Sequence, residues 1–159
     1  ISLGPYANFY FESYETMKAQ IQEMLHIEKG GDEQLKDELA AYNPLIPDGK
    51  ELVATLMFEI DNPLSRAEFL NKVGGIEEKV FLKISGEIIN SIPEKDVDRT
   101  SAEGKASSVQ FIHFKFTEAQ VEKFKDFSNE IIIGIDHEMY AHTIKLTENN
   151  KKALALDFD

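Results

Sequence analysis

The 159-residue chain contains no cysteine and no tryptophan. Without cysteine it forms no disulfide, holds no iron–sulfur cluster through its own thiolates and has no thiol nucleophile. Basic residues are also scarce, because 17 Lys and Arg stand against 29 Asp and Glu, which gives a net charge of −12. A protein that binds duplex DNA needs a basic surface, so the composition argues against nucleic acid as a partner.

The sequence also has neither a signal peptide nor an apolar run long enough to span a membrane. We therefore expect a soluble cytoplasmic protein. Apolar residues make up 42% of the chain, which is enough for a core, and the length predicts one domain over residues 1–159. Because the chain starts without Met and inside an apparent strand, we expect an N-terminal segment to be missing from it.

The motifs of the common catalytic sites are absent too. The sequence has no nucleophile elbow, phosphate-binding loop, dinucleotide fingerprint or His-Glu-x-x-His motif. The two Gly-Gly pairs, at residues 30–31 and 74–75, follow helical patterns and are predicted to end helices rather than to cradle phosphate. The sequence therefore leaves open whether the protein is an enzyme and whether it holds a cofactor.

Apolar periodicity predicts both strands and helices. Alternation predicts strands over residues 6–11, 51–60, 78–84, 87–89, 108–116, 130–135 and 139–146. Capping residues predict helices that begin at Ser13, Asp32, Asn62, Thr117 and Thr147. Short turns join several of the strands, so we predict an α+β fold with a mostly antiparallel, twisted sheet of about six strands and helices packed on it.

The first predicted helix carries three polar residues of interest. Glu23 and His26 are neighbours on the helix surface, away from the apolar stripe of residues 17–24. This Glu-x-x-His spacing occurs in metal bundles, where it faces the core. Here we expect a solvated surface, with a metal ligand or a partner interface as alternatives. Glu28 continues the apolar stripe and either reaches solvent or is a partly buried carboxylate with a shifted pKa.

Two histidines, His113 and His142, lie on predicted strand faces with apolar neighbours. A position in the core, with one hydrogen bond to the imidazole, is enough to explain the presence of each histidine there. If their strands are adjacent, however, the two imidazoles converge with Glu12 or Glu59, and such a set binds Zn²⁺ or Fe²⁺.

Aromatic residues and one long loop offer further candidates. Tyr10, Tyr14 and Tyr140 are suited to line a small-molecule pocket, and equally to ordinary packing at strand edges. Residues 93–107 form a long charged loop, and such loops are often functional or mobile. Within it, Asp96 and Asp98 supply too few ligands to indicate a calcium loop.

Four runs of the sequence carry a resemblance to a known family, namely GPYANFYFESYETMKAQIQEMLHIEKGG, AYNPLIPDGKELVATLMFEIDNP, DVDRTSAEGKASSVQFIHF and GIDHEMYAH. The chain resembles the uncharacterised bacterial domain-of-unknown-function family 3501 over nearly its whole length. Its members look like small soluble proteins, often encoded beside a rubrerythrin-like protein and an iron–sulfur oxidoreductase, and they carry an additional basic, helical N-terminal segment. The resemblance implies a role near peroxide or iron metabolism and supplies no catalytic residues.

Three functions follow as expectations. The first is a non-enzymatic accessory or binding module in a redox-stress setting, with a rubrerythrin-like or iron–sulfur protein as partner. The second is a metal-dependent enzyme or metal-binding protein, which requires His113, His142 and a carboxylate such as Glu59 to lie within about 5 Å of one another. The third is a structural subunit of a homodimer, with Glu23 and His26 at the interface.

Overall fold

The computed structural model describes residues 1–94 and 100–158, so Asp96 and Asp98 lie outside the described residues. This part of the chain forms five α-helices and two antiparallel sheets, which confirms the α+β class. The strands are divided between two sheets rather than joined in one. The helices and 3-10 turns are α1 Tyr14–Glu28, α2 Gly31–Tyr42, η1 Asn43–Leu45, α3 Pro63–Lys72, η2 Ile76–Glu78, α4 Glu118–Lys125 and α5 Glu148–Ala155.

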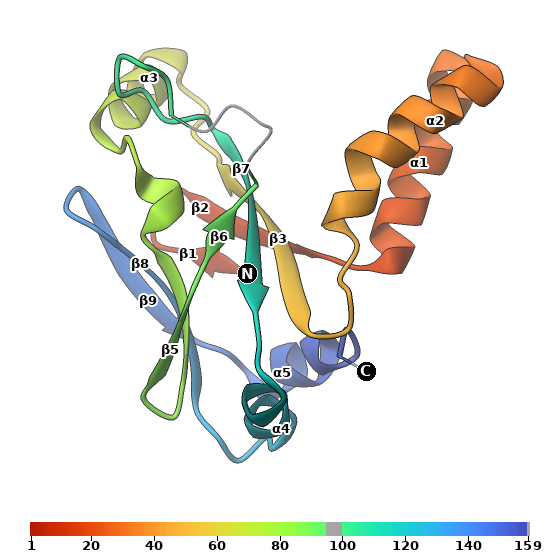
Figure 1. Cartoon of the computed structure of the whole chain (residues 1–159). Helices are drawn as coiled ribbons and strands as arrows, with labels where there is room; N and C mark the ends of the chain where they lie inside the picture. The colour runs from red at the N-terminus through yellow and green to blue at the C-terminus, as the bar shows by residue number, and fades with distance from the viewer. Residues whose placement is uncertain (95–99, 159) are drawn as a thin grey trace.

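Both sheets are antiparallel throughout (Figure 1). The five-stranded sheet has the order β1 Ser2–Leu3, β2 Ala7–Glu12, β3 Glu51–Phe58, β7 Val109–Lys115 and β6 Ile92–Pro93. The four-stranded sheet has the order β5 Glu87–Asn90, β4 Val80–Ile84, β8 Ile131–His137 and β9 Tyr140–Lys145. The sequence pattern did not predict β1 and β6, because two residues are too few to show an alternation.

One hydrophobic core joins the two sheets. Phe9, Leu56 and Phe114 of the five-stranded sheet are fully buried together with Leu82 and Ile133 of the four-stranded sheet. These residues all lie on the apolar side of their strands, so the alternation in the sequence determines which face of each sheet turns inward. The core stabilises the sheets as a pair and leaves their outer faces for other contacts.

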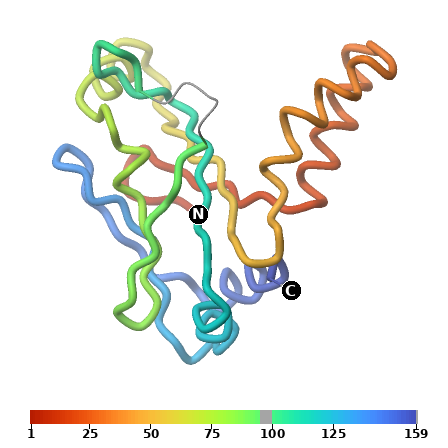
Figure 2. Tube along the Cα trace, viewed as in Figure 1, coloured from red at the N-terminus to blue at the C-terminus, as the bar shows by residue number. Residues whose placement is uncertain are grey.

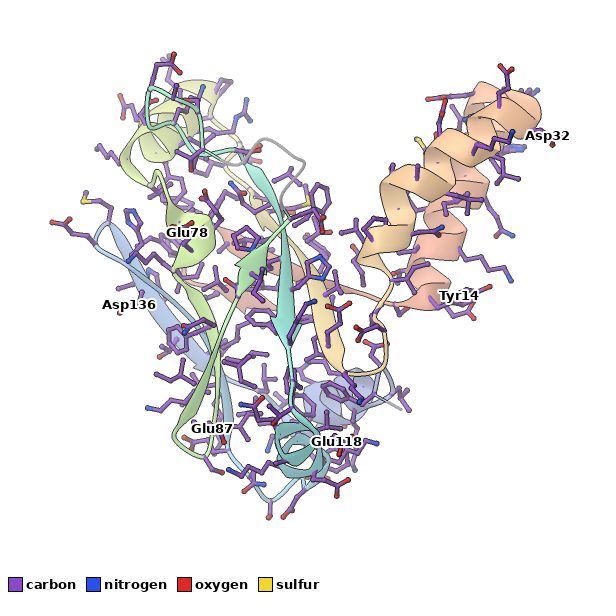
Figure 3. All side chains as sticks on the ribbon, in the orientation of Figure 1. Tyr14, Asp32, Glu78, Glu87, Glu118 and Asp136 are labelled. Atoms are coloured by element: carbon purple, nitrogen blue, oxygen red, sulfur yellow. The ribbon has the colours of Figure 1, made fainter. Side chains whose placement is uncertain are left out.

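Helices α1 and α2 form a hairpin that projects away from the sheets (Figures 1 and 2). We call this hairpin, residues 14–42, the helical arm. Its foot packs on the outer face of the five-stranded sheet, where Met17, Leu45 and Val53 are buried beside Tyr42 and Phe111. Strand β3 is therefore covered on both sides at this point, as its two apolar faces predicted. Figure 3 shows Tyr14 at the foot of the arm and Asp32 at its tip.

Local capping chemistry sets the helix starts. Ser13 and Thr16 form a capping box at α1, and Thr117 and Thr147 form the same device at α4 and α5, so these three predicted N-caps are confirmed. Asn62 caps α3 through its side chain, as predicted. None of the helices in the described part of the chain is long and apolar enough to cross a membrane.

The turn at the tip of the arm differs from the prediction. Helix α1 ends at Glu28, and the residue directly after it, Lys29, takes the left-handed conformation with φ of 53°, while Gly31 has a positive φ of 72°. The side chain of Gln34 closes this turn by hydrogen bonds. Its Oε1 accepts a hydrogen bond from the Gly30 N–H at 2.6 Å, and its Nε2 donates to the Met24 carbonyl at 3.0 Å. Gly30, not Asp32, is therefore the residue that precedes α2.

Candidate functional site

A groove lies between the foot of the helical arm and strands β6 and β7. Its enclosed part, about 410 Å³, is lined by Ala40, Ala41, Tyr42, Pro44, Leu45, Glu94 and Phe111. An adjoining hollow of about 340 Å³ is lined by Pro44, Glu51, Ile92, Pro93, Glu94, His113 and Lys115. Pro44 and Glu94 line both spaces, so the two adjoin, and together we call them the arm groove.

His113 lies between two carboxylates at the sheet side of the arm groove. Its Nδ1 is 3.0 Å from Oε2 of Glu51, and its Nε2 is 2.6 Å from Oε2 of Glu94. The exposed fractions of the side chains are 11% for His113, 7% for Glu51 and 24% for Glu94. We call these three residues the carboxylate–imidazole trio. Only Glu94 has substantial access to solvent, so it is the member that a ligand in the groove reaches first.

Strand register brings the trio together. Val53 of β3 lies opposite His113 of β7, so Glu51, two residues earlier in β3, projects on the same outer face. Ile92 of β6 pairs with His113 on its other side. The Glu94 N–H donates to the Phe111 carbonyl at 2.9 Å, which extends the pairing of β6 with β7 by one step and places Glu94 beside the imidazole.

The surroundings of the imidazole favour its protonated form. The hydrogen bond with Glu51 is the largest influence raising the pKa of His113, and the bond with Glu94 and the charges of both carboxylates act in the same direction. Burial opposes them by disfavouring the charged ring, but the pKa remains above its usual value. As an imidazolium, His113 donates from both nitrogens, and with both carboxylates ionised the trio carries one net negative charge. Such a group can hold a proton or attract a cationic side chain.

The structure does not bring His113, His142 and Glu59 together. His113 lies in β7, which pairs with β3 and β6, whereas His142 lies in β9 of the other sheet. Glu59 accepts a hydrogen bond from the Tyr10 hydroxyl at 2.6 Å. The condition of adjacent strands, on which the two-histidine site depends, is therefore not met. Within residues 1–94 and 100–158, no three His, Asp or Glu side chains are arranged to hold a metal ion.

The three candidate tyrosines occupy separate places. Tyr140 is buried, and its hydroxyl donates to the Leu3 carbonyl and accepts from the N–H groups of Tyr6 and Ala7. It therefore fixes the turn between β1 and β2 rather than lining a pocket. Tyr10 is half exposed on β2, and Tyr14 is exposed at the start of α1.

The remaining carboxylates named from the sequence lie outside the arm groove. Glu12 accepts hydrogen bonds from the hydroxyls of Thr55 and Thr16, at 2.9 and 2.7 Å, and so connects β2, β3 and α1. Glu28 is exposed and accepts from Gln34 at 3.1 Å, which agrees with a stem that reaches solvent. Glu23 and His26 are exposed on the arm, which is the solvated surface that we expected for them.

Sequence reasoning identified His113 but missed both of its partners. Glu51 is the first residue of an otherwise apolar strand and shares a face with Val53, so a lone carboxylate on a buried strand was a usable signal. Glu94 follows Pro93 inside what was predicted to be a solvated loop. Nothing in the local sequence indicates that this part of the loop pairs with β7.

Comparison with known proteins places this architecture in a family. The family model described as "Protein of unknown function (DUF3501)" matches residues 1–158. A crystal structure of a protein of unknown function from Burkholderia pseudomallei K96243 is similar, with 36% sequence identity and a TM-score of 0.91. The match covers 100% of this chain and 83% of that one. No curated protein matches significantly. The chain therefore belongs to the DUF3501 family, whose function is unknown.

Proposed function

We propose that this protein is an accessory binding module that holds a segment of a partner protein in the arm groove. The observation that carries the proposal is the position of the carboxylate–imidazole trio, which forms the polar end of a groove whose enclosed part is mostly apolar. An apolar floor with a few polar groups at one end is the usual composition of a specific binding site.

The apolar part of the groove suits a side chain from another protein. Tyr42 and Phe111 are only partly buried against the foot of the arm, so their remaining surface faces the groove. Ala40 and Ala41 are exposed and small, which allows a partner backbone to approach α2 closely. Burying an exposed aromatic surface of this kind is a common source of binding energy at interfaces.

Charge favours a basic partner segment. The arm carries seven carboxylates against three lysines, and the sheet side of the groove contributes Glu51 and Glu94. Lys115 also lines this side and offsets part of that charge. We expect the segment to place a Lys or Arg near Glu94 and an apolar residue against Phe111, because opposite charges steer and orient such complexes.

The resemblance described above supplies the candidate partners. The family that the chain resembles is often encoded beside a rubrerythrin-like protein and an iron–sulfur oxidoreductase, so we propose that one of these two proteins carries the bound segment. This assignment concerns the partner's identity alone. The groove and its expected basic, apolar occupant rest on the contacts of this chain.

The test is calorimetric titration of the full-length protein with a purified rubrerythrin-like protein and, separately, with a purified iron–sulfur oxidoreductase. We expect a dissociation constant below about 50 μM, equivalent to a binding free energy of about −6 kcal/mol. Ala41→Lys places a long cation in the groove and should weaken binding at least about tenfold, the effect of roughly 1.4 kcal/mol. The matched control is Ala119→Lys, which changes an exposed alanine of α4 far from the groove.

Glu94→Gln separates charge from shape. It keeps the size of the side chain but removes the negative charge, so a basic segment should bind more weakly and with less dependence on salt. Failure of both the rubrerythrin-like protein and the iron–sulfur oxidoreductase to bind at about 50 μM would contradict the proposed partners. Binding that Ala41→Lys and Ala119→Lys affect equally would show that the arm groove is not the site.

A further inference from the structure

A second hollow, separate from the arm groove, lies on the four-stranded sheet. It measures about 500 Å³, and its lining includes Phe81, Asn90 and Thr143 together with Glu78, Lys79 and Asp136. Figure 3 shows Glu78 on the η2 turn and Asp136 on β8. Alternation places Phe81, Asn90 and Thr143 on the outer face of the sheet, since Leu82, Ile89 and Ile133 on the other face are buried in the core.

A glycine positions the aromatic ring of this hollow. In the strand register, Asn90 pairs with Phe81, Phe81 with Gly134, and Gly134 with Thr143, so the four residues form one row across the sheet. A Cβ atom at Gly134 would lie 2.5 Å from Cζ of Phe81. The ring of Phe81 therefore lies over the glycine, and the part of the ring that extends beyond the glycine lines the hollow. Among the described residues, Phe81 has no aromatic neighbour.

Polar groups stand on either side of this ring. In the part of the chain that the structure describes, the side chains of Asn90 and Thr143 make no hydrogen bond to other protein groups. An amide and a hydroxyl are together able to donate and accept several hydrogen bonds in the plane of a bound ring. A partly exposed aromatic ring between two such side chains suits a planar ligand with polar edges.

A lysine lies in the next row of the same face. Lys83 is two residues after Phe81 in β4, which places it about 7 Å away along the strand. Its row partners are Ile88 and Ile132, and it forms no ion pair within residues 1–94 and 100–158. Lys145 follows Ile132 in this row and pairs with Glu130 at 3.4 Å. In a chain with a net charge of −12, Lys83 is therefore the cation of this row that no carboxylate of the described residues neutralises.

We infer that this face binds a nucleoside monophosphate. The planar nitrogen heterocycle stacks on Phe81 and exchanges hydrogen bonds with Asn90 and Thr143, and the phosphate lies against Lys83. Stacking on an aromatic side chain tolerates any base. Glu78 and Asp136, on the lining of the hollow, repel an anionic group, and Lys79 beside them offsets only part of their charge, so the phosphate is oriented towards the lysine row. This inference is independent of the partner proposed for the arm groove.

The test uses the four common ribonucleoside 5′-monophosphates as probes, together with adenosine and ribose 5-phosphate. We expect saturation-transfer NMR signals from at least one nucleotide and a dissociation constant below about 1 mM by calorimetry. Adenosine should bind about three- to tenfold more weakly than its monophosphate, because it lacks the charge that Lys83 attracts. Ribose 5-phosphate, which has no ring to stack, should give no signal.

Variants assign the two halves of the ligand. Phe81→Ala and Phe81→Leu should both abolish nucleotide binding. Phe81→Leu keeps most of the apolar volume, so it provides the test if Phe81→Ala does not fold. Lys83→Gln should reduce the affinity for the nucleotide to that for adenosine and leave adenosine unchanged. Lys18→Gln, on the exposed surface of the arm, is the control.

Each other outcome overturns the inference. Absence of signal from all four nucleotides at about 1 mM excludes the site. Equal affinity for adenosine and its monophosphate would show that Lys83 does not attract the phosphate, and it would exclude a nucleotide as the ligand. Binding that survives Phe81→Leu shows that the ligand lies elsewhere on the protein.

Discussion

The Nε2 atom of His113 lies 2.6 Å from a carboxylate oxygen of Glu94, a residue 19 positions earlier in the chain. This contact attaches the end of β6 to β7 through side chains, in addition to the backbone bond from Glu94 to Phe111. Because the imidazole must carry a proton on each nitrogen to donate to both Glu51 and Glu94, the strength of this attachment depends on pH.

Stability should therefore fall as His113 loses its proton. The pKa of His113 is raised in the folded protein, first by the hydrogen bond with Glu51, above the value of about 6.5 for a free imidazole. A group with a raised folded pKa contributes its full stabilisation below the unfolded pKa and loses it as pH rises through the folded pKa. The free energy of unfolding of the wild type, minus that of His113→Gln, should be largest below about pH 6.5 and should decline as the pH rises above that value.

Urea denaturation at several pH values measures this difference, and an NMR titration of the imidazole reports the pKa directly. The control is His26→Gln, which removes an imidazole from the exposed arm without touching the trio. A difference that stays constant or increases with pH would contradict the assigned role of His113.

Removing Glu51 should destabilise the protein more than removing an exposed glutamate. Glu51 is buried, and Glu51→Ala leaves the Nδ1 of His113 without its partner, which should cost about 1–3 kcal/mol. Glu118 pairs with Lys50 at the surface, so Glu118→Ala should change stability by about 0.5 kcal/mol or less. Chemical denaturation of the two variants at one pH decides the matter, and equal effects would show that the trio adds no stability.

Two tyrosine variants make a matched pair. Tyr140→Phe removes a buried hydroxyl that holds three backbone groups of the β1–β2 turn, so we expect a loss of about 1–3 kcal/mol. Tyr10→Phe removes an exposed hydroxyl that contacts Glu59, and the expected change is within about 0.5 kcal/mol. Thermal melting of both proteins tests the prediction. A Tyr140→Phe variant as stable as the wild type would show that water replaces the hydroxyl.

Gly134→Ala should be destabilising because of Phe81. The added methyl group would lie 2.5 Å from the ring, and relieving such a clash typically costs about 1–3 kcal/mol. Removing the ring should relieve it, so Gly134→Ala should cost less in a Phe81→Ala background than in the wild type. A double-mutant cycle of unfolding free energies measures this coupling. Additive effects would mean that the ring does not lie over the glycine.

Features that depend on a few neighbouring residues were predictable from the sequence. The N-caps at Ser13, Thr117 and Thr147 were identified because the side chain that caps a helix bonds to backbone groups within the first turn. The buried faces of the strands also followed from alternation. Lys29 shows the limit of such reasoning, since it takes the left-handed conformation that ends α1 although two glycines follow it.

Features that depend on strand pairing were not predictable. The division into two sheets follows from which strands meet, and alternation within a strand does not specify its partner. His113 was recognisable as a polar residue on an apolar strand, but Glu51 lies 62 residues away and Glu94 lies in a predicted loop. Because the sequence does not show which strands pair, His142 was a candidate partner of His113, although the two belong to different sheets.

The helical arm is an insertion in a β-hairpin. Strands β2 and β3 are antiparallel neighbours with Glu12 opposite Val53, so a short turn would be enough to connect them, yet residues 13–50 intervene. Each doubling of a connection adds only about 0.6 kcal/mol of closure entropy, so the sheets tolerate connections of very different lengths here. Val53 and Phe111 fix the foot, but nothing in the sheet register depends on the tip. Evolution or design can therefore change the reach of the arm, turn by turn, without altering the body that carries it.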